Sequence, residues 1–135
     1  MTAISLPYTL EVSEWSTPAS TYPEETSGEA RIIRRPYNYG HYRMWGIDDH
    51  LFFRVRKPIQ VTTLQILEPR ARGDKKEWQT WMVDDPPQYR SMQLFAQQSR
   101  GRVLCAGLGL GLICYELVKN PEVKSITVIE RNSSV

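Results

Sequence analysis

Short runs of β-branched and aromatic residues, separated by proline and glycine, dominate the chain up to residue 83. Runs bounded by such turn residues predict strands rather than helices. We expect an N-terminal antiparallel β region with one solvent-exposed face, interrupted by a long loop over 13–29 that is rich in Ser, Thr, Pro and Glu. The predicted strands span 5–12, 29–35, 41–45, 51–57, 59–67 and 77–83.

The pattern changes at "DDPPQYR" (84–90), where two prolines end the strand region. Apolar residues then recur at helical spacing and predict an amphipathic helix over 87–98. A short apolar run over 102–106 fits a buried parallel strand. A helix over 112–120, ended by Asn120-Pro121, and a β-branched strand over 125–130 complete a strand–helix–strand unit.

These elements predict an α/β fold with two parts. Residues 1–83 form the antiparallel β region, and residues 84–135 form the start (βαβ) of a Rossmann-like domain. Parallel strands are normally covered on both faces, and one helix cannot cover two of them. We therefore expect the second part to be incomplete, and the chain to self-associate or to require a C-terminal half that it lacks.

Composition and charge argue against some classes of binding partner. Of 135 residues, 41% are hydrophobic and 24% charged, and the net charge is only +2, so nothing indicates a nucleic-acid or membrane partner. Cys105 and Cys114 lie in apolar sequence and read as free thiols. With no signal peptide evident at the start, a cytoplasmic protein is expected. His41 and His50 have no partners at ligand spacing, so no metal site is predicted.

Three glycines stand where the strand over 102–106 turns into its helix: Gly107, Gly109 and Gly111. Glycine allows a tight turn and a close approach of ligand to backbone, and the helix that follows offers unpaired N–H groups. Glu130 comes nineteen residues after Gly111, at the end of the next strand. A carboxylate there can accept hydrogen bonds from both hydroxyls of a ribose. The pattern favours a nucleoside-type ligand that carries an anionic group.

The spacing G-x-G-x-G followed by this acid resembles class I S-adenosylmethionine-dependent methyltransferases. The third glycine comes one residue too early for the dinucleotide fingerprint. The resemblance implies that S-adenosylmethionine is the cofactor, with its methionine part over the turn of Gly107, Leu108, Gly109 and Gly111. It also implies that Glu130 binds the ribose and that Arg131 lies along the adenine edge.

Within that superfamily the stretch 84–132 is most similar to polyamine (spermidine) synthases. Asp85 and Tyr89 match the family's acid–x–x–x–Tyr segment, which would place both residues at the site. Ser91 and Leu110 stand where that family has acids. We therefore expect a methyltransferase-like transferase of the polyamine synthase type, whose substrate and catalytic residues cannot be read from the sequence.

Three alternatives stay open. The first is an aminopropyltransferase that uses decarboxylated S-adenosylmethionine, and the second is a non-catalytic binding or assembly module. In the third, Asp85 and Tyr89 are structural residues and not site residues: Asp85 caps the helix over 87–98, and Tyr89 packs beneath that helix. The aromatic run over 37–45 favours a hairpin with paired rings over a base-stacking surface.

Overall fold

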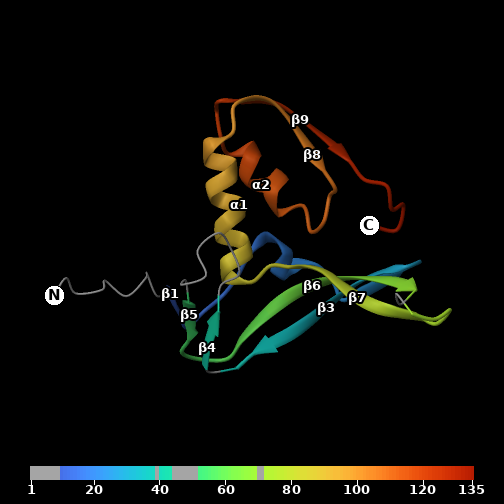
Figure 1. Ribbon diagram of the computed structural model, residues 1–135. Coiled ribbons are helices and arrows are strands. Elements are labelled where there is room, and N and C mark those ends of the chain that lie inside the picture. Colours follow the sequence, from blue (N-terminus) through green and yellow to red (C-terminus); the bar gives the residue numbers. More distant parts are fainter. Residues whose placement is uncertain (1–9, 39, 44–51, 70–71) are drawn as a thin grey trace.

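A computed structural model describes residues 10–38, 40–43, 52–69 and 72–135 (Figure 1). The described elements are, in order, β1 (Leu10–Val12), a 3-10 helix η1 (Pro18–Thr21), β2 (Glu25–Ser27), β3 (Ala30–Tyr37), β4 (Gly40–Arg43), β5 (Phe52–Val55), β6 (Ile59–Pro69), β7 (Lys76–Val83), α1 (Pro86–Gln98), β8 (Gly101–Ala106), α2 (Leu112–Val118) and β9 (Val123–Ile129). The mixed α/β class is confirmed. Parts of the predicted strands over 5–12, 41–45 and 51–57, together with His50, lie outside the described residues.

A four-stranded antiparallel sheet in the order β2-β3-β6-β7 forms the base of the molecule. The expected solvent-exposed face is wrong for β6, one of the two inner strands, because Thr62, Thr63 and Gln65 are as buried as their apolar neighbours. Polar partners make this possible: Gln65 accepts from Arg31 Nε at 2.7 Å and donates to Thr80 at 3.2 Å. Burial of polar groups is tolerated where they are hydrogen-bonded.

The second sheet has the order β1-β5-β4, and it corrects the prediction of a purely antiparallel region, because β1 and β5 pair in parallel. Strand β4 runs antiparallel to β5, with Tyr42 opposite Phe53. The predicted loop over 13–29 contains structure of its own. Thr17 caps η1 by accepting from Ala19 N, and β2 pairs with β3 as a short edge strand.

Asp84 ties this N-terminal segment to the sheet. Its fully buried carboxylate accepts hydrogen bonds from the Thr17 hydroxyl and from Thr62 N, the latter at 2.6 Å. Its backbone carbonyl accepts from Trp15 Nε1 at 2.8 Å. One aspartate thus joins η1, β6 and the end of β7.

The C-terminal part has the predicted strand–helix–strand order, and β8 and β9 pair in parallel. Both helices contribute to a hydrophobic cluster against one face of this pair, through Ala96 of α1 and Leu117 of α2 around Cys105. The other face is open: Leu104 is 64% exposed and Ile129 60%. The prediction of a buried strand over 102–106 is therefore wrong for this face of β8, and the described residues do not form a complete Rossmann fold.

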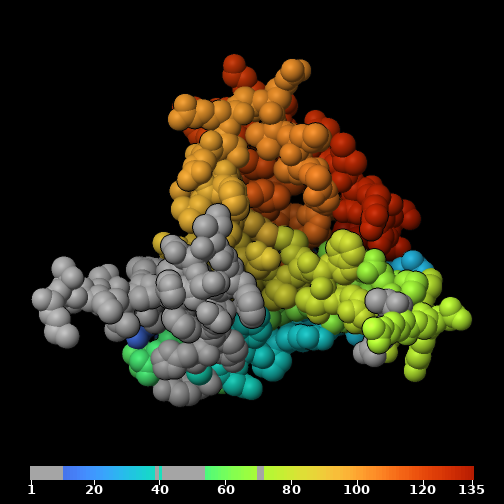
Figure 2. Space-filling model, in the orientation of Figure 1, coloured from blue at the N-terminus to red at the C-terminus, as the bar shows by residue number. Residues whose placement is uncertain are grey.

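One hydrophobic cluster joins the two parts. It combines Ala19, Ala30, Leu64 and Ile66 with Tyr89, Leu110 and Leu112. In Figure 2 the orange and red C-terminal residues lie directly on the yellow-green residues that follow β6. The βαβ unit is therefore held at a fixed position above the four-stranded sheet, and this position creates the cavity described next.

Candidate functional site

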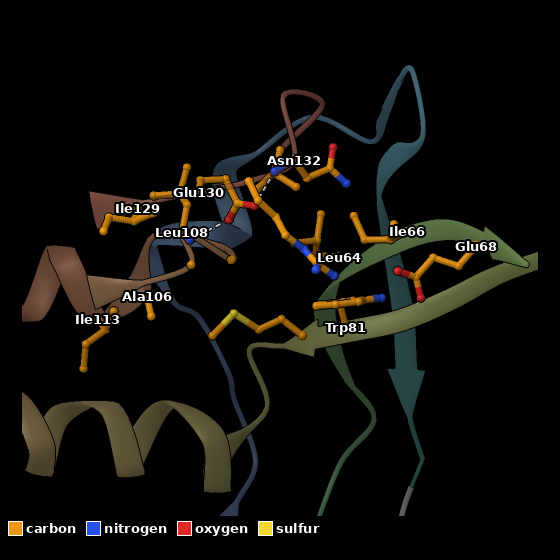
Figure 3. A pocket seen from close by; sticks show the side chains of 15 residues that line it. Leu64, Ile66, Glu68, Trp81, Ala106, Leu108, Ile113, Ile129, Glu130 and Asn132 are labelled. Carbon is orange, nitrogen blue, oxygen red and sulfur yellow. Dashed lines mark hydrogen bonds between the residues drawn. The ribbon is translucent and has the colours of Figure 1, made fainter. Parts of the chain in front are cut away.

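A cavity of about 590 Å³ lies between the four-stranded sheet and the βαβ unit (Figure 3). Cavities of this size hold small organic ligands. One wall comes from β6 and β7, and the opposite wall comes from the ends of β8 and β9 and the start of α2. The lining residues are Leu64, Ile66, Glu68, Trp81, Met82, Ala106, Gly107, Leu108, Gly109, Ile113, Ile129, Glu130, Arg131, Asn132 and Val135.

The glycine turn has a backbone that only glycine adopts readily. Gly107, Gly109 and Gly111 have φ values of 93°, 57° and 73°, in the region that side chains with a Cβ rarely enter. Gly107 N donates to Ile129 O at 2.7 Å, and Gly111 N donates to Leu108 O at 2.9 Å. The first bond fastens the turn to the end of β9, so the turn and the strand that carries Glu130 are joined at the cavity.

Glu130 points at the glycine turn. One carboxylate oxygen accepts from Leu108 N at 2.8 Å, and the other accepts from Asn132 N at 2.9 Å. The Leu108 N–H bond, followed by that from Asn132, lowers the pKa of the Glu130 carboxyl below its ordinary value of 4.5. The group is therefore ionised at neutral pH. The backbone N–H of Arg131 makes a further, smaller contribution in the same direction. A carboxylate has about four acceptor sites, so acceptor capacity remains for a ligand hydroxyl beside these three backbone donors.

Met82 reaches the same turn from the other wall. Its sulfur accepts from Leu110 N at 3.3 Å, and a Cβ on Gly109 would lie only 2.3 Å from that sulfur. Trp81, the residue before Met82, is skipped in the pairing of β7 with β6, because Leu64 pairs with Met82 and Gln65 pairs with Thr80. This β-bulge lets two consecutive residues line one cavity, a role in which bulges are common.

Charges in the cavity wall are few and mainly acidic. Glu68 and Glu130 carry negative charge, and Arg131 carries the one positive charge among the lining residues. Figure 3 shows Glu68 and Trp81 on the sheet side, and Ala106, Ile113 and Ile129 on the side of the βαβ unit. The wall is mostly apolar, with a small number of polar groups near the turn, as in most small-ligand sites.

Asp85 lies at a different place. It caps α1 by accepting from Gln88 N at 3.1 Å, and it accepts from the Tyr37 hydroxyl at 2.8 Å. Burial raises the pKa of its carboxyl above the ordinary value of 3.8, while the Tyr37 bond opposes the rise. Asp85 lines a smaller neighbouring cavity of about 250 Å³, which shares Trp81 and Met82 with the large one.

Tyr89 lines neither of these two cavities. Its ring is buried beneath α1, with an edge-on contact to Trp15 at 6.1 Å between centroids. Its hydroxyl donates to the buried Glu116 carboxylate of α2. Desolvation, and then this carboxylate, raise the pKa of Tyr89. The alternative in which Asp85 caps the helix and Tyr89 packs beneath it therefore matches their positions.

The geometry brings together most of the residues predicted from sequence: Gly107, Leu108, Gly109, Glu130 and Arg131 line one cavity, and Gly111 caps α2 beside it. The sheet wall, with Trp81 and Met82, was not predicted. The bulge that brings both residues to the cavity has no clear signal in the sequence, because β7 shows no regular alternation of polar and apolar residues.

Comparison with known proteins gives no match, either to a protein-family model, to a curated protein or to a solved structure. Among the described residues no cluster of His, Cys, Asp or Glu could hold a metal ion. The helices in that same part of the chain are too short or too polar to cross a membrane. The site must therefore be interpreted from its own geometry.

Proposed function

We propose that the large cavity binds S-adenosylmethionine or a close relative, and that the chain is a methyltransferase-like protein of the polyamine synthase type. In this proposal β8, α2 and β9 correspond to the start of a Rossmann-like domain. The observation that carries it is the hydrogen bond between Glu130 and Leu108 N. It brings a carboxylate able to accept from ribose hydroxyls to the edge of a glycine-rich turn.

The charge of the cavity supports a sulfonium ligand over a nucleotide. A phosphate group is usually met by Lys, Arg or several free N–H groups, whereas the lining residues here carry two carboxylates and one guanidinium. A ligand with positive charge at its sulfur and its amino group suits this lining. The helix dipole adds little to the argument, since α2 has only seven residues.

The residues then have distinct roles. Glu130 accepts from the ribose, and Arg131 lies along the adenine edge. Gly107 allows the ligand to lie against the backbone, and Gly109 would do so once the Met82 side chain has moved. The apolar wall, including Ile113 and Ile129, excludes water from the sulfur. When bound, the ligand supplies an alkyl group made electrophilic by the sulfonium. The task of the protein is then mainly orientation and desolvation, which requires no nucleophilic side chain.

Titration calorimetry with S-adenosylmethionine, S-adenosylhomocysteine and methylthioadenosine tests the proposal. We expect micromolar binding that Glu130→Gln weakens about tenfold or more, because glutamine has one acceptor oxygen where the carboxylate has two. Glu122→Gln, at an exposed residue directly before β9, is the matched control and should bind as the unaltered chain does.

Absence of heat with all three ligands would refute the cofactor assignment and favour a non-catalytic module. Tighter binding of decarboxylated S-adenosylmethionine than of the carboxylated form would instead favour an aminopropyltransferase. Equal losses in Glu130→Gln and Glu122→Gln would show that charge alone, and not the position of Glu130, determines affinity.

A further inference from the structure

The first two glycines of the turn, Gly107 and Gly109, differ in how much space lies over them. A Cβ placed on Gly107 would meet only Glu130 Oε2, at 3.9 Å. A Cβ on Gly109 would lie 2.3 Å from Met82 Sδ and 3.4 Å from its terminal methyl. The Met82 side chain thus fills the space over Gly109, and no ligand atom fits between the two.

Met82 also accepts a hydrogen bond from the backbone beside Gly109. Leu110 N donates to the Met82 sulfur at 3.3 Å. A thioether is a weak acceptor, whereas a carboxylate bound to a backbone N–H forms a charge-assisted bond that is about twice as strong. A ligand carboxylate would therefore gain by replacing the sulfur, but only after the Met82 side chain has moved.

These groups distinguish two regions of the cavity: an open region at Gly107, and a region at Gly109 that the Met82 side chain fills. With the ribose at Glu130, the open region at Gly107 lies beside the nucleoside. In the proposed binding mode the substituent on the ribose extends toward Gly109. Leu110 is buried, and its N–H, now bonded to Met82, would become a donor for an anionic end group there only once Met82 has moved. The side chain now in that place is itself a thioether with a methyl end, so it resembles the part of the ligand that it excludes.

We propose that Met82 determines specificity in this site by excluding the amino-acid tail of the ligand until its own side chain is displaced. This inference rests on the proposed function. Nucleosides with a short thioether need not displace Met82, whereas nucleosides with the full amino-acid tail must do so. The conformational cost reduces the apparent affinity for the second group only.

The test compares methylthioadenosine with S-adenosylhomocysteine, because both are uncharged at sulfur and differ in the tail. Calorimetry gives the ratio of their dissociation constants. Met82→Ala opens the turn at Gly109, and we expect it to shift the ratio about tenfold in favour of S-adenosylhomocysteine, because the cost of displacing the Met82 side chain is then absent. Met82→Val repeats the test with a side chain that strands favour, in case the alanine variant folds poorly.

Met92→Ala is the matched control. Met92 is also half-buried against the shared core, but it lines neither cavity. It should leave the ratio unchanged. If Met82→Ala and Met82→Val bind both ligands with the unaltered ratio, the inference fails while the cofactor assignment stands. If no variant binds either ligand, the cofactor assignment fails and this inference fails with it.

Discussion

Removing the Tyr89 hydroxyl distinguishes a structural role from a role at the ligand. In Tyr89→Phe the ring stays and keeps its contact with Trp15. The buried Glu116 carboxylate loses one donor and retains Lys119 Nζ at 3.1 Å. A hydrogen bond to a charged group contributes about 1.5–3 kcal/mol. We expect the free energy of unfolding to fall by about 2 kcal/mol, because the remaining ion pair is half exposed and replaces little of the loss.

Urea unfolding measures this change. For a chain of this size, with a slope of about 1–3 kcal/mol per molar, the midpoint should fall by roughly 1 M at unchanged slope. Tyr115→Phe deletes the same hydroxyl from a ring that is 48% exposed on α2, and it should change stability by no more than about 0.5 kcal/mol. In a Glu116→Gln background the Tyr89→Phe loss should shrink to about 1 kcal/mol, since the bond is then between neutral groups.

The opposite pattern would refute the assignment. If Tyr89→Phe leaves the unfolding midpoint in place but weakens nucleoside binding tenfold, then Tyr89 contacts ligand, as the resemblance to polyamine synthases implies. Equal stability losses for the two tyrosine variants would show that the bond to Glu116 contributes nothing measurable.

Asp84→Ala should lower the free energy of unfolding by about 3–5 kcal/mol in thermal or urea unfolding. The substitution leaves two buried donors, the Thr17 hydroxyl and Thr62 N, without their acceptor. Asp85→Asn keeps the α1 cap. Because the pKa of Asp85 is raised in the folded state, the free energy of unfolding of the wild type falls as pH rises from 3.8 through the raised value. Across that pH range the variant should therefore become more stable relative to the wild type, as pH-dependent unfolding would measure. A difference in stability that does not change with pH would contradict the raised pKa. The exposed side chains of Leu104 and Ile129 predict self-association, which sedimentation velocity should detect and Leu104→Lys should reduce.

Local sequence patterns were sufficient to predict most elements. The helix over 87–98 and the strand–helix–strand unit follow from apolar spacing and from proline and glycine, which act within a few residues. The position of Glu130 beside the turn also follows, because parallel neighbouring strands end at the same edge of a sheet. These predictions needed no knowledge of contacts between distant segments.

The features that the sequence did not reveal depend on contacts between segments that lie far apart in the chain. The parallel pairing of β1 with β5 has no local signal. The burial of Gln65 depends on Arg31 and Thr80 from neighbouring strands, and a polar residue in an alternating pattern is otherwise read as exposed. The carboxylates of Asp84 and Asp85 also differ in their distant partners, which are Thr17 and Thr62 for Asp84 and Tyr37 for Asp85.

The glycine turn depends on both parts of the chain, which explains why the site cannot be reduced to the βαβ motif. Leu110 is the point of contact: its N–H bonds Met82 of β7, and its carbonyl accepts from the Tyr22 hydroxyl at 2.9 Å. Leu108 N is held by Glu130 from the other side. Three segments thus fix one backbone stretch whose dihedral angles are strained for most residues. A ligand bound between the sheet and the turn would bridge these segments, so binding and the packing between the two parts must be energetically coupled.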